Sequence, residues 1–324
     1  MSQEFRSKKV YKIKFESFWD DFDPEHSFLH RLFQIAGLSL IVSTSKEQVS
    51  VIFSSHFKPK VTPLRQLKLD IKHFLAQTFK GKVSKIVTSA PPDFSTLRIF
   101  YTGENYRVPF TEQYSLSHDL DDNNSRNIYY PYLFDHLLMA KLKQHDHLFG
   151  NLINYEYLFS KRDFKEHPRK FACIFFGNDV PVRRRLIGEL SQFGEVDIFG
   201  KANNRYVSDR SKLFGQYRYV LCPENDYFPG YVTEKIMHAY SMGAVPIYWG
   251  GLTKHQGINV NSTILVDPSE SLKLQFEKIA NLQQSLYKEI YEQPLMIQEP
   301  NWSGVVDKIV YWIESWKSDS TNDH

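Results

Sequence analysis

The chain is poor in cysteine and in net charge, and each shortage excludes a class of protein. It has only two cysteines, Cys173 and Cys222, and both lie in apolar, strand-like runs. Two buried thiols are therefore expected rather than a disulfide or a zinc site, which fits a reducing compartment. The net charge is +3, from 40 basic and 37 acidic residues. So small a charge gives no general attraction to nucleic acid, and any recognition of anions must be local.

Long apolar runs are also missing. Residues 1–15 contain no apolar segment of the kind found in signal peptides. The best membrane candidate, residues 32–42, falls well short of the ~20 residues that a transmembrane helix needs. We therefore expect a soluble, cytoplasmic protein without a membrane anchor, while its oligomeric state stays unknown.

The two commonest phosphate-binding loops are absent as well. No G-x-G-x-x-G follows a strand-like run, and no G-x-x-x-x-G-K-S/T occurs. The missing glycine fingerprint argues against a Rossmann dehydrogenase.

The first half of the chain alternates strand-like and helix-like segments. Runs rich in β-branched and aromatic residues predict strands at 9–15, 38–43, 49–54 and 96–102. Apolar residues at helical spacing predict helices over 64–79 and 132–142. Strands that alternate with helices indicate an α/β fold with a parallel, doubly wound sheet.

The same alternation restarts after residue 170. Strands are predicted at 170–176, 195–200, 217–222, 244–250 and 262–267. Helices are predicted at 182–193 and 234–242, the second ending at Gly243. A long helix is expected with Asp267 as its N-cap and Pro268 at its first position, and another helix over 301–316.

The charged segment 161–170 is interpreted as an interdomain linker. It divides the chain into an N-terminal domain over 1–160 and a C-terminal domain over 161–300, with residues 301–324 as a helix that braces the two and a polar tail. Two Rossmann-like domains with a ligand between them is the simplest arrangement.

Basic residues stand at the start of two helices in the second half. Arg183 to Arg185 open one helix and Lys235 opens the next. The helix dipole favours acids at this end, so a bound polyanion would explain these cations. A solvated basic turn is the open alternative for the arginine triplet. For Lys235, which lies between strand-like runs, an anionic ligand is the only explanation that we find in the sequence.

Three blocks resemble the α1,3/α1,4-fucosyltransferases. Residues 222–251, CPENDYFPGYVTEKIMHAYSMGAVPIYWGG, are similar to the family's donor motif over their whole length. Residues 99–110, which include Tyr-Thr-Gly-Glu-Asn, resemble a second family segment, and residues 176–201 resemble a third. Gly177 stands where the family usually has serine. The first ninety residues carry no resemblance beyond the fold.

The resemblance implies a GT-B glycosyltransferase of the inverting type, with two Rossmann-like domains facing a cleft. Its donor would be GDP-β-L-fucose, bound by the C-terminal half, and its acceptor O3 or O4 of N-acetylglucosamine in a lactosamine-type glycan. No cofactor or metal is expected. Asp21-Phe22-Asp23 spells D-x-D, a metal-binding signal in other glycosyltransferases, but it lies far from the donor block and is interpreted as an acidic loop.

The resemblance also assigns roles to single residues. Glu104 would be the catalytic base, with capping of the next turn as its alternative role, and Arg183 and Lys235 would stabilise the GDP leaving group. The remaining predicted donor contacts are Asn178, Tyr206, Asn225, Tyr231 and Glu234. Apart from the resemblance, Trp19 and Asp20 follow the first predicted strand and are candidate acceptor contacts, since sugars stack on aromatic faces; packing is the open alternative for Trp19. His238, a lone helical histidine, is expected to be packed or solvated.

Other functions stay open from sequence alone. The chain could use another GDP-sugar or an unusual acceptor. It could also be a non-catalytic protein that binds sugar nucleotides or glycans, although the predicted base and Lys235 are both present.

Overall fold

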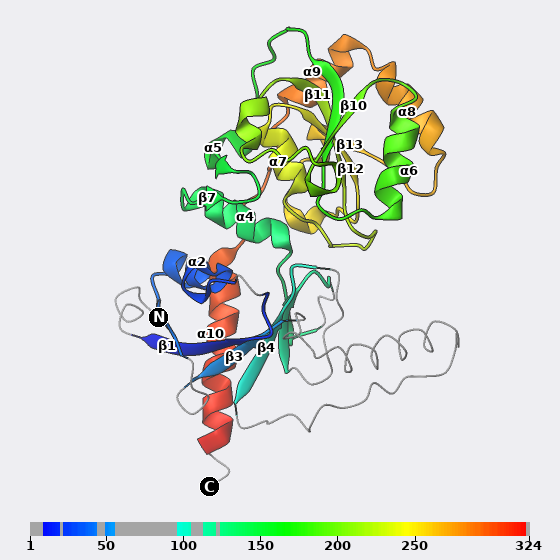
Figure 1. Cartoon of the computed structure of the whole chain (residues 1–324). Helices are drawn as coiled ribbons and strands as arrows, with labels where there is room; N and C mark the ends of the chain where they lie inside the picture. The colour runs from blue at the N-terminus through cyan, green and yellow to red at the C-terminus, as the bar shows by residue number, and fades with distance from the viewer. Residues whose placement is uncertain are drawn as a thin grey trace, which may run out of the picture. The chain divides into compact units, whose positions relative to one another are not determined.

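The computed structural model describes residues 9–19, 22–43, 49–55, 96–104, 113–120 and 124–321. They belong to two compact units, each built on its own parallel sheet (Figure 1). The first unit is Met1–Thr102, Tyr106–Leu116 and Ser303–His324, and the second is Gly103–Asn105 and Ser117–Trp302. The helix expected at 64–79 and the candidate residue Asp20 lie outside the described residues.

The first unit contains five parallel strands of a six-stranded sheet, whose sixth strand, β6 (Asn127–Tyr129), follows β5. The five are β1 (Val10–Glu16), β2 (Ser39–Val42), β3 (Val51–Ser54), β4 (Leu97–Tyr101) and β5 (Tyr114–Ser117). Their order is β2-β1-β3-β4-β5, and Ile13 of β1 lies level with Val42 of β2 and Val51 of β3. The strands predicted at 9–15, 38–43, 49–54 and 96–102 are confirmed to within two residues at each end.

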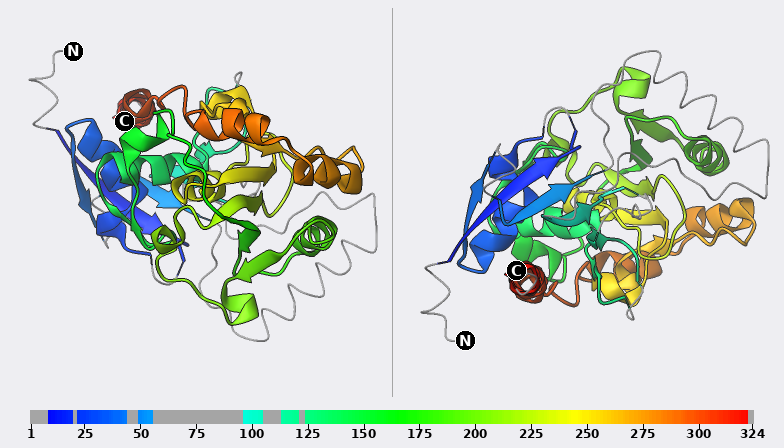
Figure 2. Two further views of the ribbon diagram at one scale, coloured as in Figure 1. Left: turned by 90° about the horizontal axis from the view of Figure 1, so that it is seen from above. Right: turned by 90° about the horizontal axis from the view of Figure 1, so that it is seen from below.

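Two helices pack their aromatic residues against this sheet. In α2 (Phe28–Ile35), Phe28 stacks on Tyr101 of β4 at a centroid distance of 3.9 Å. In α10 (Trp302–Thr321), which Figure 2 shows end-on, Trp312 stacks on Tyr114 of β5 at 4.4 Å. Burial of these large rings draws the C-terminal helix, from Ser303 onward, into the first unit.

The second unit contains a parallel sheet in the order β10-β9-β11-β12-β13. Its strands are β9 (Lys170–Phe175), β10 (Val196–Phe199), β11 (Tyr217–Pro223), β12 (Val245–Trp249) and β13 (Ile264–Leu265). All five fall inside predicted strands or extend one residue beyond them.

Helices cover both faces of this sheet (Figure 1). On one face, α6 (Pro181–Leu190), α8 (Leu272–Ala280) and α9 (Gln284–Glu292) enclose the main apolar core. On the other face lies α7 (Lys235–Ser241), whose first backbone carbonyl is 3.5 Å from the thiol of Cys222. Both cysteines are free and buried, as predicted.

The part of the chain that follows β5 and precedes β9 belongs to the second unit. It contains β6 (Asn127–Tyr129), α4 (Tyr132–Lys141), β7 (His145–Asp146), β8 (Asn151–Leu152) and α5 (Tyr155–Leu158). The charged stretch 161–170, expected to be a linker, also lies within this unit. Arg162 is 3% exposed and donates hydrogen bonds to the carbonyls of Tyr240, Ala244 and Tyr291. These three hydrogen bonds hold the guanidinium group of Arg162 inside the unit, so the stretch is fixed there at Arg162 and is not a fully exposed linker.

One predicted helix start is wrong. Asp267 caps no helix, because its carboxylate accepts hydrogen bonds from the backbone N–H and the hydroxyl of Ser269 and so closes a local turn. The helix begins five residues later, at Leu272, and ends at Ala280, so that α8 and α9 replace the single long helix. The end of α7 is as predicted, with Gly243 at φ +70°.

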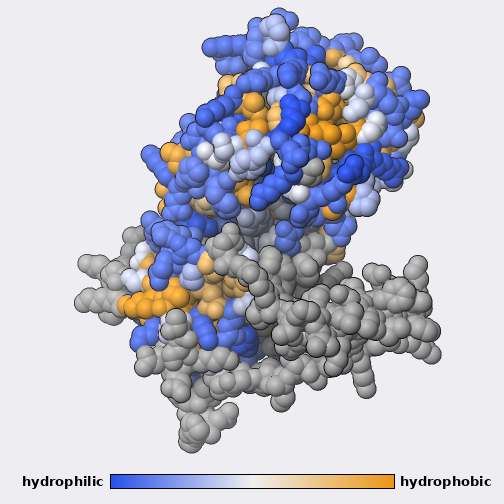
Figure 3. All heavy atoms as spheres, viewed as in Figure 1, coloured by the Kyte–Doolittle hydropathy of each residue, from blue (hydrophilic) through white to orange (hydrophobic). Residues whose placement is uncertain are grey.

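The surface of the second unit is mixed in character. On the face seen in Figure 3, apolar atoms lie within a rim of hydrophilic residues. Over the described ranges, no helix combines the length and the hydropathy that crossing a membrane would require.

Candidate functional site

A cavity of about 200 Å³ opens in the second unit at the carboxyl ends of β9 and β11. This is the edge at which parallel α/β sheets bind ligands, because the loops that follow the strands diverge there. Its lining includes three basic residues, Arg183, Arg210 and Lys235, and one acidic residue, Glu234. The cavity is therefore suited to an anion.

Lys235 has a partner within the protein, which corrects the inference that only a ligand could explain it. Its ammonium group donates to a carboxylate oxygen of Glu224 at 2.8 Å and to the hydroxyl of Thr233 at 2.6 Å. Burial works to lower the pKa of Lys235, but Glu224 and Glu234 outweigh it and raise the pKa. Lys235 therefore stays charged at the cavity wall.

Glu224 is the central acceptor of this corner. It follows β11 and is fully buried, and it also accepts hydrogen bonds from the backbone N–H and the hydroxyl of Thr233 and from the hydroxyl of Tyr248. Position 250 requires glycine, because a Cβ atom there would lie 2.7 Å from Cγ of Glu224. Sequence reasoning noticed Glu224 at a strand end but left it out of the site, because its partners lie 9 to 24 residues further along the chain.

Arg183 is turned inward from the first turn of α6 and is 4% exposed. Its guanidinium group donates to the backbone carbonyl of Asn178 and to the side-chain carbonyl of Asn225, and it lies over the ring of Phe176. Burial lowers its pKa, although Glu224 works in the other direction. The neighbouring Arg184 instead pairs with Asp179 at the surface. The arginine triplet thus divides into one cavity residue, Arg183, one surface ion pair, formed by Arg184, and one further exposed side chain, Arg185.

Glu104 connects to the same group of residues. One of its carboxylate oxygens accepts hydrogen bonds from the side-chain amide of Asn225 at 3.0 Å and from the hydroxyl of Tyr231 at 2.8 Å. Burial and the nearby Glu104 raise the pKa of Tyr231, so the phenol stays protonated and donates. Asn225 therefore bridges Glu104 to Arg183, and the predicted residues Glu104, Asn178, Arg183, Asn225 and Tyr231 form one network.

Glu234 lies at the N-terminus of α7 and is 9% exposed. Burial works to raise its pKa, but Lys235, followed by His136, outweighs it and lowers the pKa to about 2. A buried carboxylate among cations remains ionised across the physiological range. It supplies the negative charge of the cavity wall.

Not all predicted residues join this network. Tyr206 is 67% exposed and is absent from the cavity lining. Trp19 lies in the first unit, where its ring packs against Phe18 and Phe22 at centroid distances of 5.7 and 4.8 Å. Asp20 lies outside the described residues.

Sequence reasoning missed Arg210 and underestimated His238, and both line the cavity. Arg210 begins a short 3-10 helix, Arg210–Leu213, in a segment without a motif. His238 is 2% exposed and hydrogen-bonded to Arg210 and to Asp146. Nothing in the sequence pairs these residues, because they come from three separate elements.

In chemical terms, the arrangement offers two functions side by side. Basic side chains can bind and neutralise a phosphorylated group within the cavity. Glu104, joined to the cavity through Asn225, offers a carboxylate that can accept a proton.

Comparison with known proteins gives a consistent result. The pattern of the family described as glycosyltransferase family 10 (fucosyltransferase), C-terminal part, matches residues 167–293. One relative is a protein of Acanthamoeba polyphaga mimivirus that is provisionally named a fucosyltransferase. It is 27% identical over 267 residues, which is 77% of this chain and 39% of that protein. The alpha-(1,3)-fucosyltransferase of Helicobacter pylori is 28% identical over 225 residues, 61% of this chain and 47% of that enzyme. The chain thus spans less than half the length of these curated relatives.

A solved structure of an alpha1,3-fucosyltransferase is similar over almost the whole chain. It covers 94% of this chain and 90% of its own, with a TM-score of 0.69 and 19% sequence identity. A likeness at this level of identity shows the fold. The predicted α/β class, a GT-B-type fold with two Rossmann-like domains, is therefore confirmed.

Proposed function

Because the chain belongs to the fucosyltransferases of glycosyltransferase family 10, we propose that it transfers L-fucose from GDP-β-L-fucose to a sugar hydroxyl. The donor is suggested by the solved alpha1,3-fucosyltransferase structures, two of which are described with GDP and with GDP-fucose. The transfer inverts the configuration at C1 of fucose, so it proceeds by a single in-line displacement.

The observation that carries this proposal is the charge of the cavity in the second unit. Arg183, Arg210 and Lys235 line it, and Glu234 is the one carboxylate among the described residues of its lining. A nucleoside diphosphate is the anionic part of a GDP-sugar and needs this kind of environment to leave.

The leaving group is stabilised by Lys235 and Arg183. Lys235 is held in place by Glu224 before any ligand arrives, so little reorganisation is needed when the diphosphate departs. Among the residues that the structure describes, Arg183 donates only to neutral carbonyl oxygens, and its charge is therefore still available to a phosphate. Because side chains supply this charge, the reaction requires no metal.

Glu104 is the base that deprotonates the acceptor hydroxyl. The amide of Asn225 and the phenol of Tyr231 both donate to one oxygen of its carboxylate, which fixes the orientation of the group. Asn225 also links the base to Arg183, so one side chain contacts both parts of the machinery.

The remaining assignments concern substrate contacts. Asn178, Asn225 and Glu234, which line the cavity, are proposed to contact the donor, Tyr231 to contact its fucose, and Tyr206 to reach the donor from its exposed position. The acceptor is O3 or O4 of N-acetylglucosamine in a lactosamine-type glycan, with Trp19 and Asp20 as contacts in the N-terminal half.

The test is an acceptor screen with GDP-fucose, read by mass and by linkage analysis of the product. GDP-mannose in place of GDP-fucose is the matched donor control. The proposal predicts a fucosylated product from GDP-fucose and none from GDP-mannose. Transfer from GDP-mannose would indicate a transferase for another GDP-sugar. Binding of GDP without transfer to any glycan would indicate a sugar-nucleotide-binding protein.

A further inference from the structure

Arg210 presents an unusual charge at the cavity wall. Its guanidinium group lies over the ring of Phe175 at 4.6 Å and donates to Nδ1 of His238 at 2.9 Å. Within the described part of the chain, its buried Nε finds no hydrogen-bond acceptor and its guanidinium pairs with no carboxylate. The charge of Arg210 therefore lies beside the cavity with a neutral hydrogen-bond partner, while burial lowers its pKa and Glu234 and Asp146 work in the other direction.

The contact with Arg210 fixes the state of the His238 ring. A guanidinium group has only donors, so Nδ1 of His238 has to accept and carries no proton. The ring proton then sits on Nε2, which donates to a carboxylate oxygen of Asp146 at 3.0 Å. Burial lowers the pKa of His238 and the charge of Arg210 adds to this, while Asp146 works in the other direction. His238 is therefore a neutral imidazole that connects Arg210 to Asp146.

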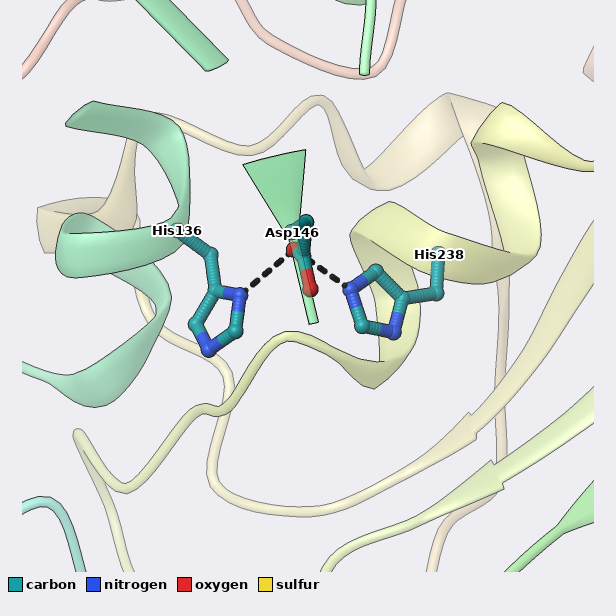
Figure 4. A group of neighbouring side chains, drawn as sticks. All are labelled: His136, Asp146 and His238. Carbon is teal, nitrogen blue, oxygen red and sulfur yellow. Dashed lines mark hydrogen bonds and ion pairs between the residues drawn. The ribbon is translucent and has the colours of Figure 1, made fainter. Parts of the chain in front are cut away.

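Asp146 is the rigid end of this connection. Figure 4 shows its carboxylate between the rings of His136 from α4 and His238 from α7, with both contacts drawn. One oxygen accepts from both histidines, and the other accepts from the backbone N–H groups of Leu148 and Phe149 at 2.9 Å each. Four donors hold a buried carboxylate in one position.

The same three side chains resemble a metal site, but their chemistry contradicts that interpretation. The nitrogen–oxygen distances are 2.6 Å to His136 and 3.0 Å to His238, which are the lengths of direct hydrogen bonds. A metal on Nε2 of His238 would also move the ring proton to Nδ1, where it would face the guanidinium donor of Arg210. The cluster instead supports Arg210.

We propose that Arg210 is a third cationic ligand for the diphosphate of the sugar nucleotide, and that His238 and Asp146 hold its guanidinium group at the cavity. This inference rests on the proposed function, since it assumes a nucleoside-diphosphate donor. Lys235 already shares its charge with Glu224 in an ion pair, whereas Arg210 forms no ion pair with a described carboxylate, although Glu234 and Asp146 act on its charge from further away. A phosphate oxygen would thus gain a full charge-assisted hydrogen bond from Arg210.

The first test compares ligands with and without phosphate. Calorimetry with GDP and with guanosine would be carried out on the wild type, on Arg210→Gln and on Arg210→Lys. Arg210→Gln is expected to weaken GDP binding by about 10- to 100-fold and to leave guanosine binding unchanged. Arg210→Lys should recover part of the GDP affinity, because it restores the charge without the fork of donors. Lys212→Gln, an exposed position in the same short helix, is the matched control and should bind GDP as the wild type does.

A second pair of variants separates a structural role of His238 from its hold on Arg210. In His238→Asn, the side-chain oxygen can replace Nδ1 as acceptor for Arg210 but cannot reach Asp146. In His238→Gln, the longer amide can reach Asp146 but offers no acceptor at the position of Nδ1. Our proposal predicts that His238→Gln loses GDP affinity and that His238→Asn keeps more of it, whichever of the two has the higher melting temperature.

Three outcomes are distinguishable. If the wild type binds no GDP, the proposed function itself fails. If the wild type binds GDP and Arg210→Gln binds it equally well, Arg210 is no phosphate ligand and the inference is overturned. If His238→Gln binds GDP as well as His238→Asn or better, the contact of His238 with Arg210 does not matter for binding, and the positioning role of His238 is overturned.

Discussion

The ammonium group of Lys235 lies 2.8 Å from the carboxylate of Glu224, and Glu224 is completely buried. This ion pair joins the first turn of α7 to the end of β11, so the cation is set in place by the folded chain alone. An arriving phosphate would share Lys235 with Glu224, and the neighbouring arginines would supply the remaining positive charge.

Loss of this buried partner should be costly. Glu224→Gln leaves the charge of Lys235 without a carboxylate, and we expect the free energy of unfolding to fall by about 3 kcal/mol. Urea denaturation measures this loss. In the double variant Glu224→Gln/Lys235→Met no buried charge is left unpaired, so its loss should be smaller than the sum of the two single losses. Strictly additive losses would show that the two side chains do not stabilise each other.

Glu234 should make stability depend on pH in the acidic range. Its folded-state pKa is lowered to about 2, from an ordinary value of 4.5, so its stabilisation is present above about pH 4.5 and is lost as the pH falls towards 2. The stability difference between wild type and Glu234→Gln should therefore shrink by about 3 kcal/mol between pH 6 and pH 2. Denaturation at a series of pH values tests this, with the exposed Glu195→Gln as control for the loss of a carboxylate. A difference that does not vary with pH would contradict the lowered pKa of Glu234.

Tyr231→Phe should separate support of the base from donor binding. The substitution keeps the buried ring and removes only the hydroxyl that donates to Glu104. Turnover should fall about tenfold because the carboxylate loses one of its orienting donors, while GDP affinity stays within about twofold. Steady-state kinetics and calorimetry on the same preparation measure both. Weaker GDP binding at unchanged turnover would instead make Tyr231 a nucleotide contact.

Metal removal should leave the activity unchanged. The proposed charge neutralisation comes from Arg183, Arg210 and Lys235, and the His136–Asp146–His238 cluster is hydrogen-bonded in a manner that disfavours metal binding. Turnover after dialysis against EDTA, with and without added Mn²⁺ or Zn²⁺, tests this prediction. A loss of activity that one of these metals restores would contradict it.

Much of the fold could be predicted from the sequence because its signals are local. β-branched and aromatic runs marked β9 and β11 to within one residue, and Gly243 marked the end of α7. The predictions failed where a residue forms hydrogen bonds with groups other than those that its local sequence suggests. Asp267 satisfied a turn rather than a helix, and the charged Arg162 became buried among carbonyl groups.

The site was predictable only where a motif held its residues together. Glu104, Asn225 and Tyr231 came from family-like segments and do form one network. Arg210 and Asp146 could not be found, because their importance depends on hydrogen bonds to His238 from distant parts of the chain. The ion pair of Lys235 with Glu224 was missed for a similar reason, since eleven residues separate the partners.

The most direct test of the central claim is the rate of fucose transfer from GDP-fucose by Glu104→Gln, measured beside the wild type with an acceptor found in the screen. The substitution preserves the shape of Glu104 but removes its ability to accept a proton. We predict a rate at least ~100-fold below that of the wild type, with GDP affinity within about twofold. Transfer by Glu104→Gln at the wild-type rate would contradict the assignment of Glu104 as the base.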